Sequence, residues 1–244
     1  MSAPADRLAH GITREALQND AVREALRERH PEVALHDDDE LLASLRATRA
    51  AAPPDAETDE ALWLFAYGSL LWNPCVAIDH SRPARLHGFH RDFRLKLTYG
   101  RGSPKAPGLM LGLAPGGSCR GAALRVTGPD LEHELHLVWR RELLTGVYRP
   151  RWVRLETPEG PLDAVTFVVD PRNPCYCGRL STDEAVQLLA TGHGVLGSAA
   201  EYLENTVAHL DELGIHDRRL HTLRAHVRRS RRAAAAGKAA PVKG

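Results

Sequence analysis

Short apolar runs in the middle of the chain predict a group of strands. Residues 62–67 form a continuous apolar run, whereas Phe93, Leu95 and Leu97 alternate with charged residues, a spacing typical of a half-buried strand. Further strands are expected at residues 86–97, 109–113, 121–126, 151–155 and 163–169. The sequence therefore predicts a sheet built largely before residue 170.

Apolar residues at helical spacing predict helices before and after this sheet. The expected helices cover residues 12–29, 130–145, 182–190, 199–213 and 218–229. Capping-box spacing precedes two of them, Ser181 with Glu184 and Ser198 with Glu201, and a glycine suited to a helix end follows two, Gly192 and Gly214. Thr127 and Asp130 have the same capping spacing before the helix at 130–145.

The grouping of the strands before a long helix, without regular strand-helix alternation, indicates an α+β fold with a mixed or mainly antiparallel, barrel-like sheet. We expect a helical extension and linker at residues 1–60, a core domain at 61–229 and a basic, disordered tail at 230–244. The acidic run at 37–40 lacks the spacing of a calcium loop and is interpreted as a solvated helix start.

Composition supports a soluble enzyme with one sizeable core. The 244 residues are 43% hydrophobic and 26% charged, with a net charge of +1. The first residues include Asp6, Arg7 and His10 and contain no long apolar run, so we expect no secretory signal, no membrane contact and a cytoplasmic location. The balanced charge gives no support for a nucleic-acid partner despite the basic tail.

Cysteines and histidines do not form a recognisable metal site in the sequence. The four cysteines are expected to be reduced thiols, and Cys175 and Cys177 form a C-x-C pair without further clustered ligands. His133 and His136 share a helix face but have no third ligand nearby. We expect neither a metal nor a cofactor.

The first run ends in a turn whose chemistry suits ligand binding. Gly68 allows a positive φ or a close approach of the main chain to a bound group, and Ser69 adds a hydroxyl beside the amides that the turn frees. No phosphate-loop motif of the form GxxxxGK[ST] is present. The turn is therefore a candidate cradle for an anion or a carbonyl group.

Glu142 continues the apolar stripe of the helix at 130–145, after Leu131, Leu135 and Val138. A carboxylate on a buried face needs a partner, so one interpretation pairs Glu142 with Arg149 or Arg151. In the other interpretation Glu142 lines a pocket, where burial raises its pKa and makes it a better base near neutrality. Periodicity alone leaves both open.

The segment from Phe65 to Pro74, together with Trp139-Arg140-Arg141-Glu142, resembles the ChaC family of glutathione-specific gamma-glutamylcyclotransferases, bacterial branch. The resemblance implies a gamma-glutamylcyclotransferase-like barrel with flanking helices, and a lyase that releases 5-oxoproline (pyroglutamate) and cysteinylglycine from glutathione without a cofactor. It implies that Glu142 is the proton acceptor. The implied substrate contacts are Leu64, Phe65, Ala66, Tyr67, Gly68, Ser69 and Tyr176.

Two departures from the family pattern bear on the substrate. Many relatives have an arginine where this chain has Leu109, for which Arg101 is a candidate substitute, and cysteines occupy positions 175 and 177. A cyclotransferase for another gamma-glutamyl amine or dipeptide, and a non-catalytic gamma-glutamyl-binding module, therefore remain alternatives. The sequence gives no indication of oligomeric state.

Overall fold

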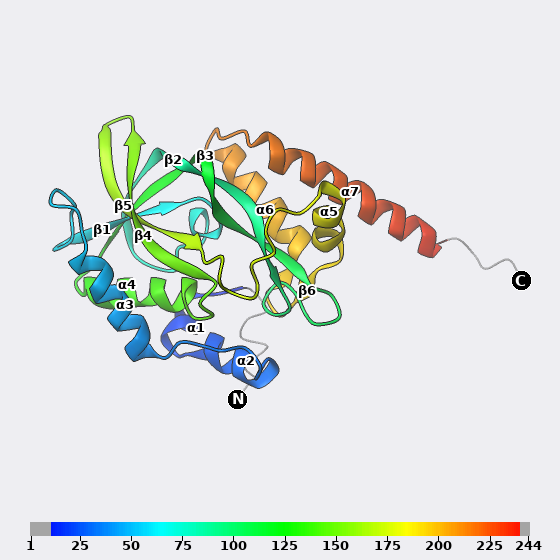
Figure 1. The fold of residues 1–244 in the computed structure, drawn as a ribbon, viewed down its shortest axis with the longest axis horizontal. Coiled ribbons are helices and arrows are strands. Elements are labelled where there is room, and N and C mark those ends of the chain that lie inside the picture. Colours follow the sequence, from blue (N-terminus) through cyan, green and yellow to red (C-terminus); the bar gives the residue numbers. More distant parts are fainter. Residues whose placement is uncertain (1–10, 240–244) are drawn as a thin grey trace, which may run out of the picture.

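A closed five-stranded barrel forms the centre of the molecule (Figure 1). The computed structural model describes residues 11–239, with side chains described up to residue 236. The strands are β1 (Ala61–Ala66), β2 (Ile78–Leu97), β3 (Gly108–Thr127), β4 (Tyr148–Thr157) and β5 (Gly160–Val169). Their order is β1-β3-β2-β4-β5, with β5 pairing again with β1 and β3. Most pairs are antiparallel, whereas β1 and β3 each pair with β5 in parallel, so the predicted mixed barrel is confirmed.

β2 and β3 are longer than the sequence predicted. Each has 20 residues, and β3 joins the two strands expected at 109–113 and 121–126. The segment between them is mostly exposed and rich in glycine. It lacks the alternation of apolar and polar residues by which a strand is recognised in a sequence. Register shifts in the β2–β3 ladder let this long hairpin bend around the barrel.

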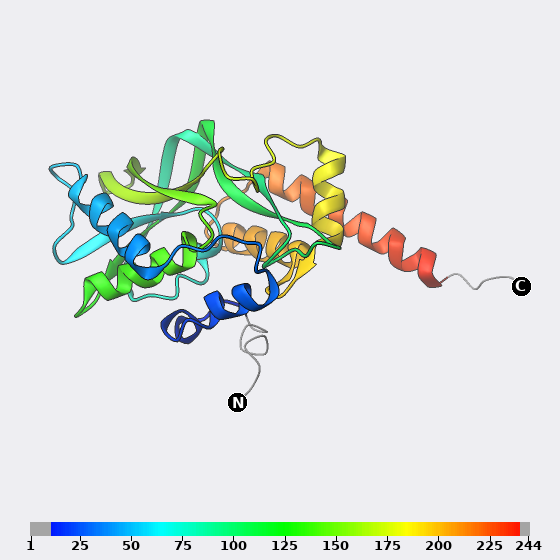
Figure 2. The ribbon, with the colours of Figure 1, turned by 60° about the horizontal axis from the view of Figure 1, so that its bottom comes forward.

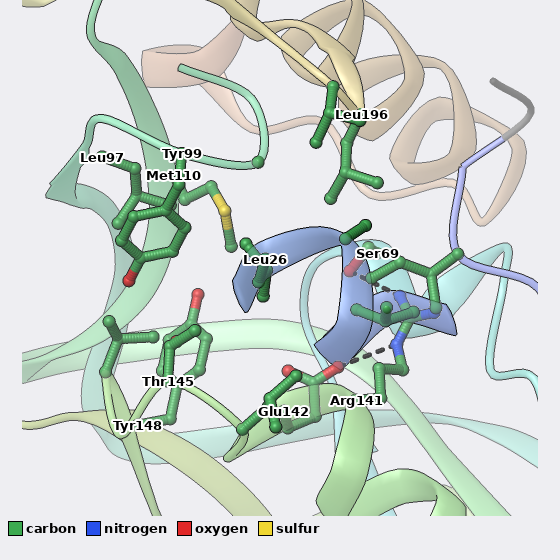
Figure 3. A pocket seen from close by; sticks show the side chains of 17 residues that line it. Leu26, Ser69, Leu97, Tyr99, Met110, Arg141, Glu142, Thr145, Tyr148 and Leu196 are labelled. Carbon is green, nitrogen blue, oxygen red and sulfur yellow. Dashed lines mark hydrogen bonds and ion pairs between the residues drawn. The ribbon is translucent and has the colours of Figure 1, made fainter. Parts of the chain in front are cut away.

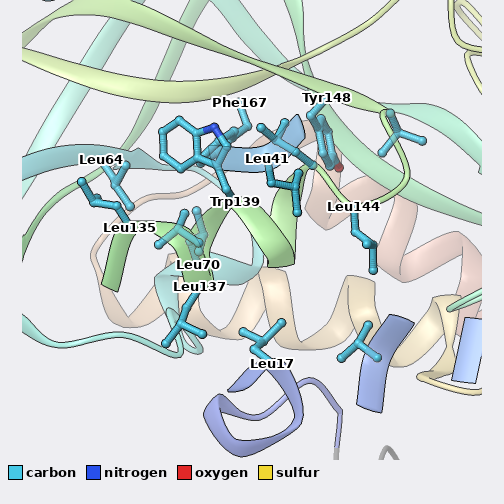
Figure 4. Packing of buried hydrophobic residues seen from close by; sticks show 14 of the residues in the cluster. Leu17, Leu41, Leu64, Leu70, Leu135, Leu137, Trp139, Leu144, Tyr148 and Phe167 are labelled. Atoms are coloured by element: carbon cyan, nitrogen blue, oxygen red, sulfur yellow. The ribbon is translucent and has the colours of Figure 1, made fainter. Parts of the chain in front are cut away.

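Helix α4 (Leu131–Glu142) crosses the barrel on the side where the N-terminal helices lie, and it supplies the centre of the main core. Trp139 is fully buried and meets Phe167 of β5 edge-on, with ring centroids 5.4 Å apart (Figure 4). The predicted Thr127–Asp130 capping box is wrong. Asp130 is itself the N-cap and accepts from the amide of His133, because the helix starts one residue later than expected.

Three helices precede the barrel: α1 (Arg14–Gln18), α2 (Ala21–Arg29) and α3 (Asp38–Ala50). In Figure 2 they lie on the α4 side of the barrel, where α1 and α3 pack against α4 and α2 packs against α1. The single helix predicted at 12–29 is therefore wrong, because Asp20 takes a left-handed conformation with φ 61° and separates α1 from α2. The solvated helix start is confirmed, with Asp37 and Glu40 forming a capping box. Buried residues of these helices, such as Leu17 and Leu41, share one core with the barrel (Figure 4). The domain boundary near residue 60 stays a prediction.

Three C-terminal helices cover another face of the barrel: α5 (Thr182–Thr191), α6 (Ala199–Glu212) and α7 (Arg218–Ala239). The short strands β6 (His193–Gly194) and β7 (Gly197–Ser198) lie between α5 and α6. The capping box of Ser181 with Glu184 is confirmed, whereas Ser198 caps α6 without the reciprocal bond from Glu201. Both predicted glycines lie at helix ends: Gly192 is the C-cap of α5 with φ −59°, and Gly214 follows α6 with a left-handed φ of 67°.

The predicted disorder from residue 230 onward is wrong for the described part of that tail. Helix α7 continues to Ala239 and projects away from the barrel (Figure 1). Arginine and alanine are strong helix formers, so the run Arg231–Ala236 extends the helix although its side chains are exposed. Residues 240–244 lie outside the described residues. Across residues 11–239, no helix combines the length and the apolar character needed to cross a bilayer.

Candidate active site

The turn after β1 lies at one end of the barrel. After Ala66 the chain passes through Tyr67 and Gly68 into the short 3₁₀ helix η2 (Ser69–Leu71). Gly68 has φ −139°, so the glycine is not needed for a left-handed conformation. A Cβ atom on Gly68 would instead lie 3.2 Å from the hydroxyl of Tyr202, so the close-approach interpretation applies. In residues 11–239, the N–H groups of Gly68, Ser69 and Leu70 donate to no other group.

Glu142 is the last residue of α4 and faces this turn. Its Oε1 accepts a hydrogen bond from Nε of Arg141 at 2.9 Å, and Nη2 of Arg141 donates to Oγ of Ser69, also at 2.9 Å (Figure 3). Arg141 Nη1 also lies 3.2 Å from the sulfur of Cys75. Arg141 therefore connects the carboxylate to the turn.

The two predicted partners of Glu142 lie elsewhere. Arg149 pairs with Asp170 at 3.4 Å, and Arg151 lies over the ring of Phe89. The interpretation of Glu142 as a helix-end pair with either of them is therefore wrong. Both arginines are exposed residues of β4, where they pair with Val168 and Thr166 of β5.

Glu142 combines burial with one unoccupied oxygen. Only 13% of its side chain is exposed, and this burial raises the pKa of the carboxyl group, while the charge and hydrogen bond of Arg141 lower it. No hydrogen bond from the described residues reaches Oε2. The carboxylate is therefore held from one side and is free to accept a proton on the other.

Three tyrosines surround this carboxylate. Burial raises the pKa of Tyr67 and of Tyr148 well above the ordinary value, and raises the pKa of Tyr202 to about 12. The hydroxyl of Tyr67 donates to the carbonyl of Phe167 at 2.7 Å, and that of Tyr148 donates to the carbonyl of Leu111 at 2.5 Å. These phenols are neutral near pH 7, and the hydroxyl protons of Tyr67 and Tyr148 are already used in hydrogen bonds to the main chain.

Glu142 opens into two connected spaces. A recess of about 280 Å³ lies between Glu142 and the turn, and it continues beside a larger space of about 800 Å³, here called the Glu142 cavity. The Glu142 cavity is bounded by side chains of α2, of the barrel strands and of the loops that follow β2, α4 and β6, including Leu26, Leu97, Tyr99, Met110, Thr145, Tyr148 and Leu196 (Figure 3).

A third space adjoins the Glu142 cavity and opens to solvent. This Arg101 chamber, of about 1,610 Å³, shares Ile12, Ser69, Met110, Arg141 and Leu196 with the Glu142 cavity. Its other walls include Arg14, Trp72, Asn73, Arg101, Glu201, Tyr202 and Asn205. A ligand held at Glu142 can therefore extend past Ser69 and Arg141 toward Arg101.

The structure brings together only some of the predicted contacts. Tyr67, Gly68 and Ser69 line the recess with Glu142. The side chains of Leu64, Phe65 and Ala66 are fully buried in the barrel, where they support the turn and line none of these three spaces. Tyr176 forms an isolated bridge with Leu95 and lies outside the linings of all three.

The two departures from the family pattern have different positions. Leu109 is fully buried under the C-terminal helices, and the neighbouring Met110 faces the cavity instead. Cys175 lies behind the cavity wall, with its sulfur 3.7 Å from the hydroxyl of Tyr99, whereas Cys177 packs against the helical core. Neither cysteine lines the cavities.

Sequence reasoning missed several residues that line the site. Arg141 lies within the segment Trp139-Arg140-Arg141-Glu142 that resembles the family, so its position beside Glu142 was the available signal. No pattern marked Tyr148 or Ile12, because the fold alone brings their distant segments to the cavity.

One cluster could hold a metal ion, and it lies apart from the cavities. The potential ligand atoms of Asp211, His216 and His221 lie within 4.8 Å of one another at the α6–α7 connection. Nε2 of His221 lies 2.8 Å from Oδ1 of Asp211, and Nδ1 of His221 lies 3.0 Å from the guanidinium of Arg224. Internal hydrogen bonds thus already account for much of this cluster.

Known proteins share both the sequence and the fold. A glutathione-specific gamma-glutamylcyclotransferase of Escherichia coli (strain K12) is 40% identical over 188 residues, which cover 77% of this chain and 80% of the relative. Glutathione-specific gamma-glutamylcyclotransferase 1 of Rattus norvegicus is 36% identical, over 66% of this chain and 75% of the relative.

A solved structure has the same fold. The yeast gamma-glutamylcyclotransferase specific to glutathione superposes with a TM-score of 0.65, covers 71% of this chain and 98% of its own, and is 21% identical. The family model described as ChaC-like protein matches residues 62–230, from the start of the barrel into α7. This protein therefore belongs to the ChaC-like family.

Proposed function

We propose that this protein is a glutathione-specific gamma-glutamylcyclotransferase, a lyase that converts glutathione to 5-oxoproline and cysteinylglycine. The observation that carries the proposal is the position of Glu142, a buried carboxylate with a raised pKa and one free oxygen, facing the Gly68–Ser69 turn across a small recess. The names of the E. coli and rat relatives support glutathione as the substrate.

The reaction needs positioning and one proton carrier, which matches the groups present. The substrate α-ammonium first gives a proton to Glu142, because a protonated amine cannot act as a nucleophile. The free amine then attacks the γ-carbonyl carbon, forming the new C–N bond of a five-membered lactam. Holding the substrate in this folded conformation makes the attack intramolecular, for which effective molarities of ~10⁵ M or more are known.

The second half of the reaction returns the proton. The attack places negative charge on the former carbonyl oxygen, and the free N–H groups of Gly68 and Ser69 are positioned to stabilise it. Protonated Glu142 then delivers its proton to the amide nitrogen as the original C–N bond breaks. The ring nitrogen still carries one surplus proton, which passes through Glu142 to the released amine, so the lactam is neutral and cysteinylglycine leaves as an ammonium. Glu142 ends the cycle as a carboxylate, and no other group is consumed.

Reduced cysteines fit a cytoplasmic location for this reaction. The four cysteines Cys75, Cys119, Cys175 and Cys177 are free thiols in the structure. Reducing compartments keep thiols in this state, so we retain the cytoplasm as the proposed site of action.

A product assay tests the proposal directly. Purified protein is incubated with glutathione, with gamma-glutamyl dipeptides and with simple gamma-glutamyl amines, and 5-oxoproline is quantified by mass spectrometry. We expect 5-oxoproline and cysteinylglycine in equal amounts from glutathione. Preference for another donor would support the alternative cyclotransferase, and no cyclised product from any donor would contradict catalysis and favour a binding module.

A further inference from the structure

Arg101 is a cationic residue of the Arg101 chamber that has no acidic partner. It follows the end of β2, and its guanidinium lies over the ring of Tyr202, with Cζ 5.2 Å from the ring centroid. Nη1 makes one long hydrogen bond, of 3.4 Å, to the carbonyl of Ser198. Among residues 11–239, no carboxylate lies within 4.0 Å of this guanidinium.

The other arginines that line the two larger spaces are already paired. Arg14 binds Glu134, and Arg141 binds Glu142. Arg101 differs because Glu201, the acidic residue that lines the chamber, forms no hydrogen bond or ion pair with its guanidinium. Glu201 affects Arg101 only through its charge at a longer distance. Burial lowers the pKa of Arg101, while the charge of Glu201 raises it and that of Arg141 lowers it. The guanidinium stays charged because arginine pKa values are so high.

A carboxylate is the ligand that this arrangement suits. A guanidinium offers parallel N–H donors that match the two oxygens of a carboxylate, and its hydrogen bonds strengthen where water is partly excluded. The main chain at Gly197 leaves space for Arg101, because a Cβ atom there would lie 3.4 Å from Nη1 and 2.7 Å from an oxygen of Glu201. Arg101 therefore keeps N–H donors that no carboxylate of the described residues occupies.

The position of Arg101 relative to Glu142 determines which carboxylate it can receive. Glu142 accepts the proton of the α-amine, so the gamma-glutamyl end of a substrate occupies the recess. The Glu142 cavity and the Arg101 chamber share the walls Ser69, Met110 and Arg141, so the rest of the peptide can extend past them into the chamber. In a gamma-glutamyl tripeptide, the group farthest along that path is the C-terminal carboxylate.

We propose that Arg101 binds the C-terminal carboxylate of the gamma-glutamyl peptide and thereby sets the preference for a substrate that ends in a free carboxylate. The inference rests on the proposed cyclotransferase function and adds a specificity-determining residue to it. Arg101 takes no part in the proton transfer, so it acts on substrate binding and orientation.

The test pairs two enzymes with two substrates. Arg101→Met keeps much of the side-chain length but removes the charge, and glutathione with an amidated glycine keeps the peptide but removes the terminal carboxylate. With the wild type, we expect kcat/KM to be about 10- to 100-fold higher for glutathione than for the amide, the range expected for hydrogen bonds between charged groups. Arg101→Met should lose this preference by lowering kcat/KM for glutathione alone.

A matched control separates charge recognition from loss of structure. Arg82 also lies over an aromatic ring, that of Trp63 at 4.3 Å, but it lines neither cavity. Arg82→Met should leave the ratio of kcat/KM between the two substrates unchanged, and circular dichroism checks the fold of both variants. An equal loss on both substrates in Arg101→Met, or a wild type that does not distinguish them, would overturn the inference.

Failure of the proposed function gives a different result. If the wild type forms no 5-oxoproline from glutathione, the cyclotransferase proposal fails by itself. Calorimetry with glutathione and its amide then tests Arg101 through binding alone. Weaker binding of the amide to the wild type but not to Arg101→Met would support the subsite, and equal binding of both ligands to the wild type would refute it.

Discussion

Two adjacent arginines on α4 serve opposite regions of the molecule. Arg140 binds Asp38 at the start of α3, where Arg23 of α2 binds the same carboxylate. Burial alone would raise the pKa of Asp38, but the hydrogen bonds and charges of Arg140 and Arg23 outweigh it and lower the pKa to about 2. Arg141 instead faces the cavity and is the sole cationic partner of Glu142 among the described residues, so burial prevails there and the pKa is raised.

The contrast shows that an ion pair between an arginine and a carboxylate can either stabilise the fold or hold a catalytic group in place. Asp38 has two cationic partners and joins three helices, so its charge is permanent near neutral pH. Glu142 has one partner and a free oxygen, so its proton affinity is closer to that needed for exchange with a substrate amine. The balance between burial and the number of cationic partners therefore separates the two roles.

The largest expected effect is on turnover in Glu142→Gln. The amide has nearly the same shape but cannot accept the proton, so we expect kcat to fall by about 10²- to 10⁴-fold, the usual contribution of general acid–base catalysis. Steady-state assays of 5-oxoproline release would measure the loss. Near-normal turnover in a folded Gln variant would contradict the role of Glu142.

The same variant should be more stable than the wild type near neutral pH. A raised folded-state pKa means that the protonated form is favoured in the folded protein, so the ionised group is unfavourable once the pH exceeds that pKa. Removing the charge should therefore raise Tm at pH 7 by a few degrees, with a smaller difference in acid. Thermal unfolding at several pH values would measure this, and a lower Tm at pH 7 would contradict it.

The second prediction concerns the pH dependence of catalysis in Arg141→Met. Loss of the positive charge removes an influence that lowers the pKa of Glu142, so the acidic limb of the pH profile of kcat should move to higher pH. Arg141→Lys keeps the charge and serves as the control, with a smaller shift. If the acidic limb of the kcat profile is unchanged in Arg141→Met, that limb does not reflect the ionisation of Glu142.

The smallest effect on activity is expected for Asp38→Asn. Asp38 lines neither cavity, so kcat/KM should change by less than about twofold. Stability should fall by about 1 kcal/mol, a modest value because 35% of the side chain is exposed and solvent screens the pairs. Denaturant unfolding would measure this change.

The pH dependence of Asp38→Asn has the opposite sign to that of Glu142→Gln. A folded-state pKa of about 2, below the unfolded value of ~3.9, means that the stabilisation exists above about pH 4 and is lost as the pH falls toward 2. The wild type and Asp38→Asn should therefore converge in stability near pH 2. A difference that persists there would assign the effect to packing instead.

Local patterns predicted the elements that frame the site. The apolar run at 62–67 became β1 and its turn, and the spacing of Leu131, Leu135 and Val138 correctly turned Glu142 inward. These features depend on residues close in sequence, where hydrophobic periodicity is a strong signal.

Contacts between residues far apart in the sequence could not be predicted from such local patterns. The partner of Glu142 could not be predicted because Arg141 is oriented by Ser69, 72 residues earlier in the chain. The left-handed Asp20 and the helical arginine-rich tail were also missed, because an aspartate is only occasionally left-handed and basic runs are more often solvated ends. Such choices depend on packing between distant segments.

The N-terminal helices have a practical consequence for work on this protein. Ile12, Val22 and Leu26 form part of the boundary of the Glu142 cavity, although they precede the segment that matches the family. A recombinant fragment trimmed to residues 62–230 would lack this wall and would admit water beside the carboxylate. Expression should therefore start upstream of α1, and affinity tags belong at the C-terminal end, beyond the helix that projects from the body.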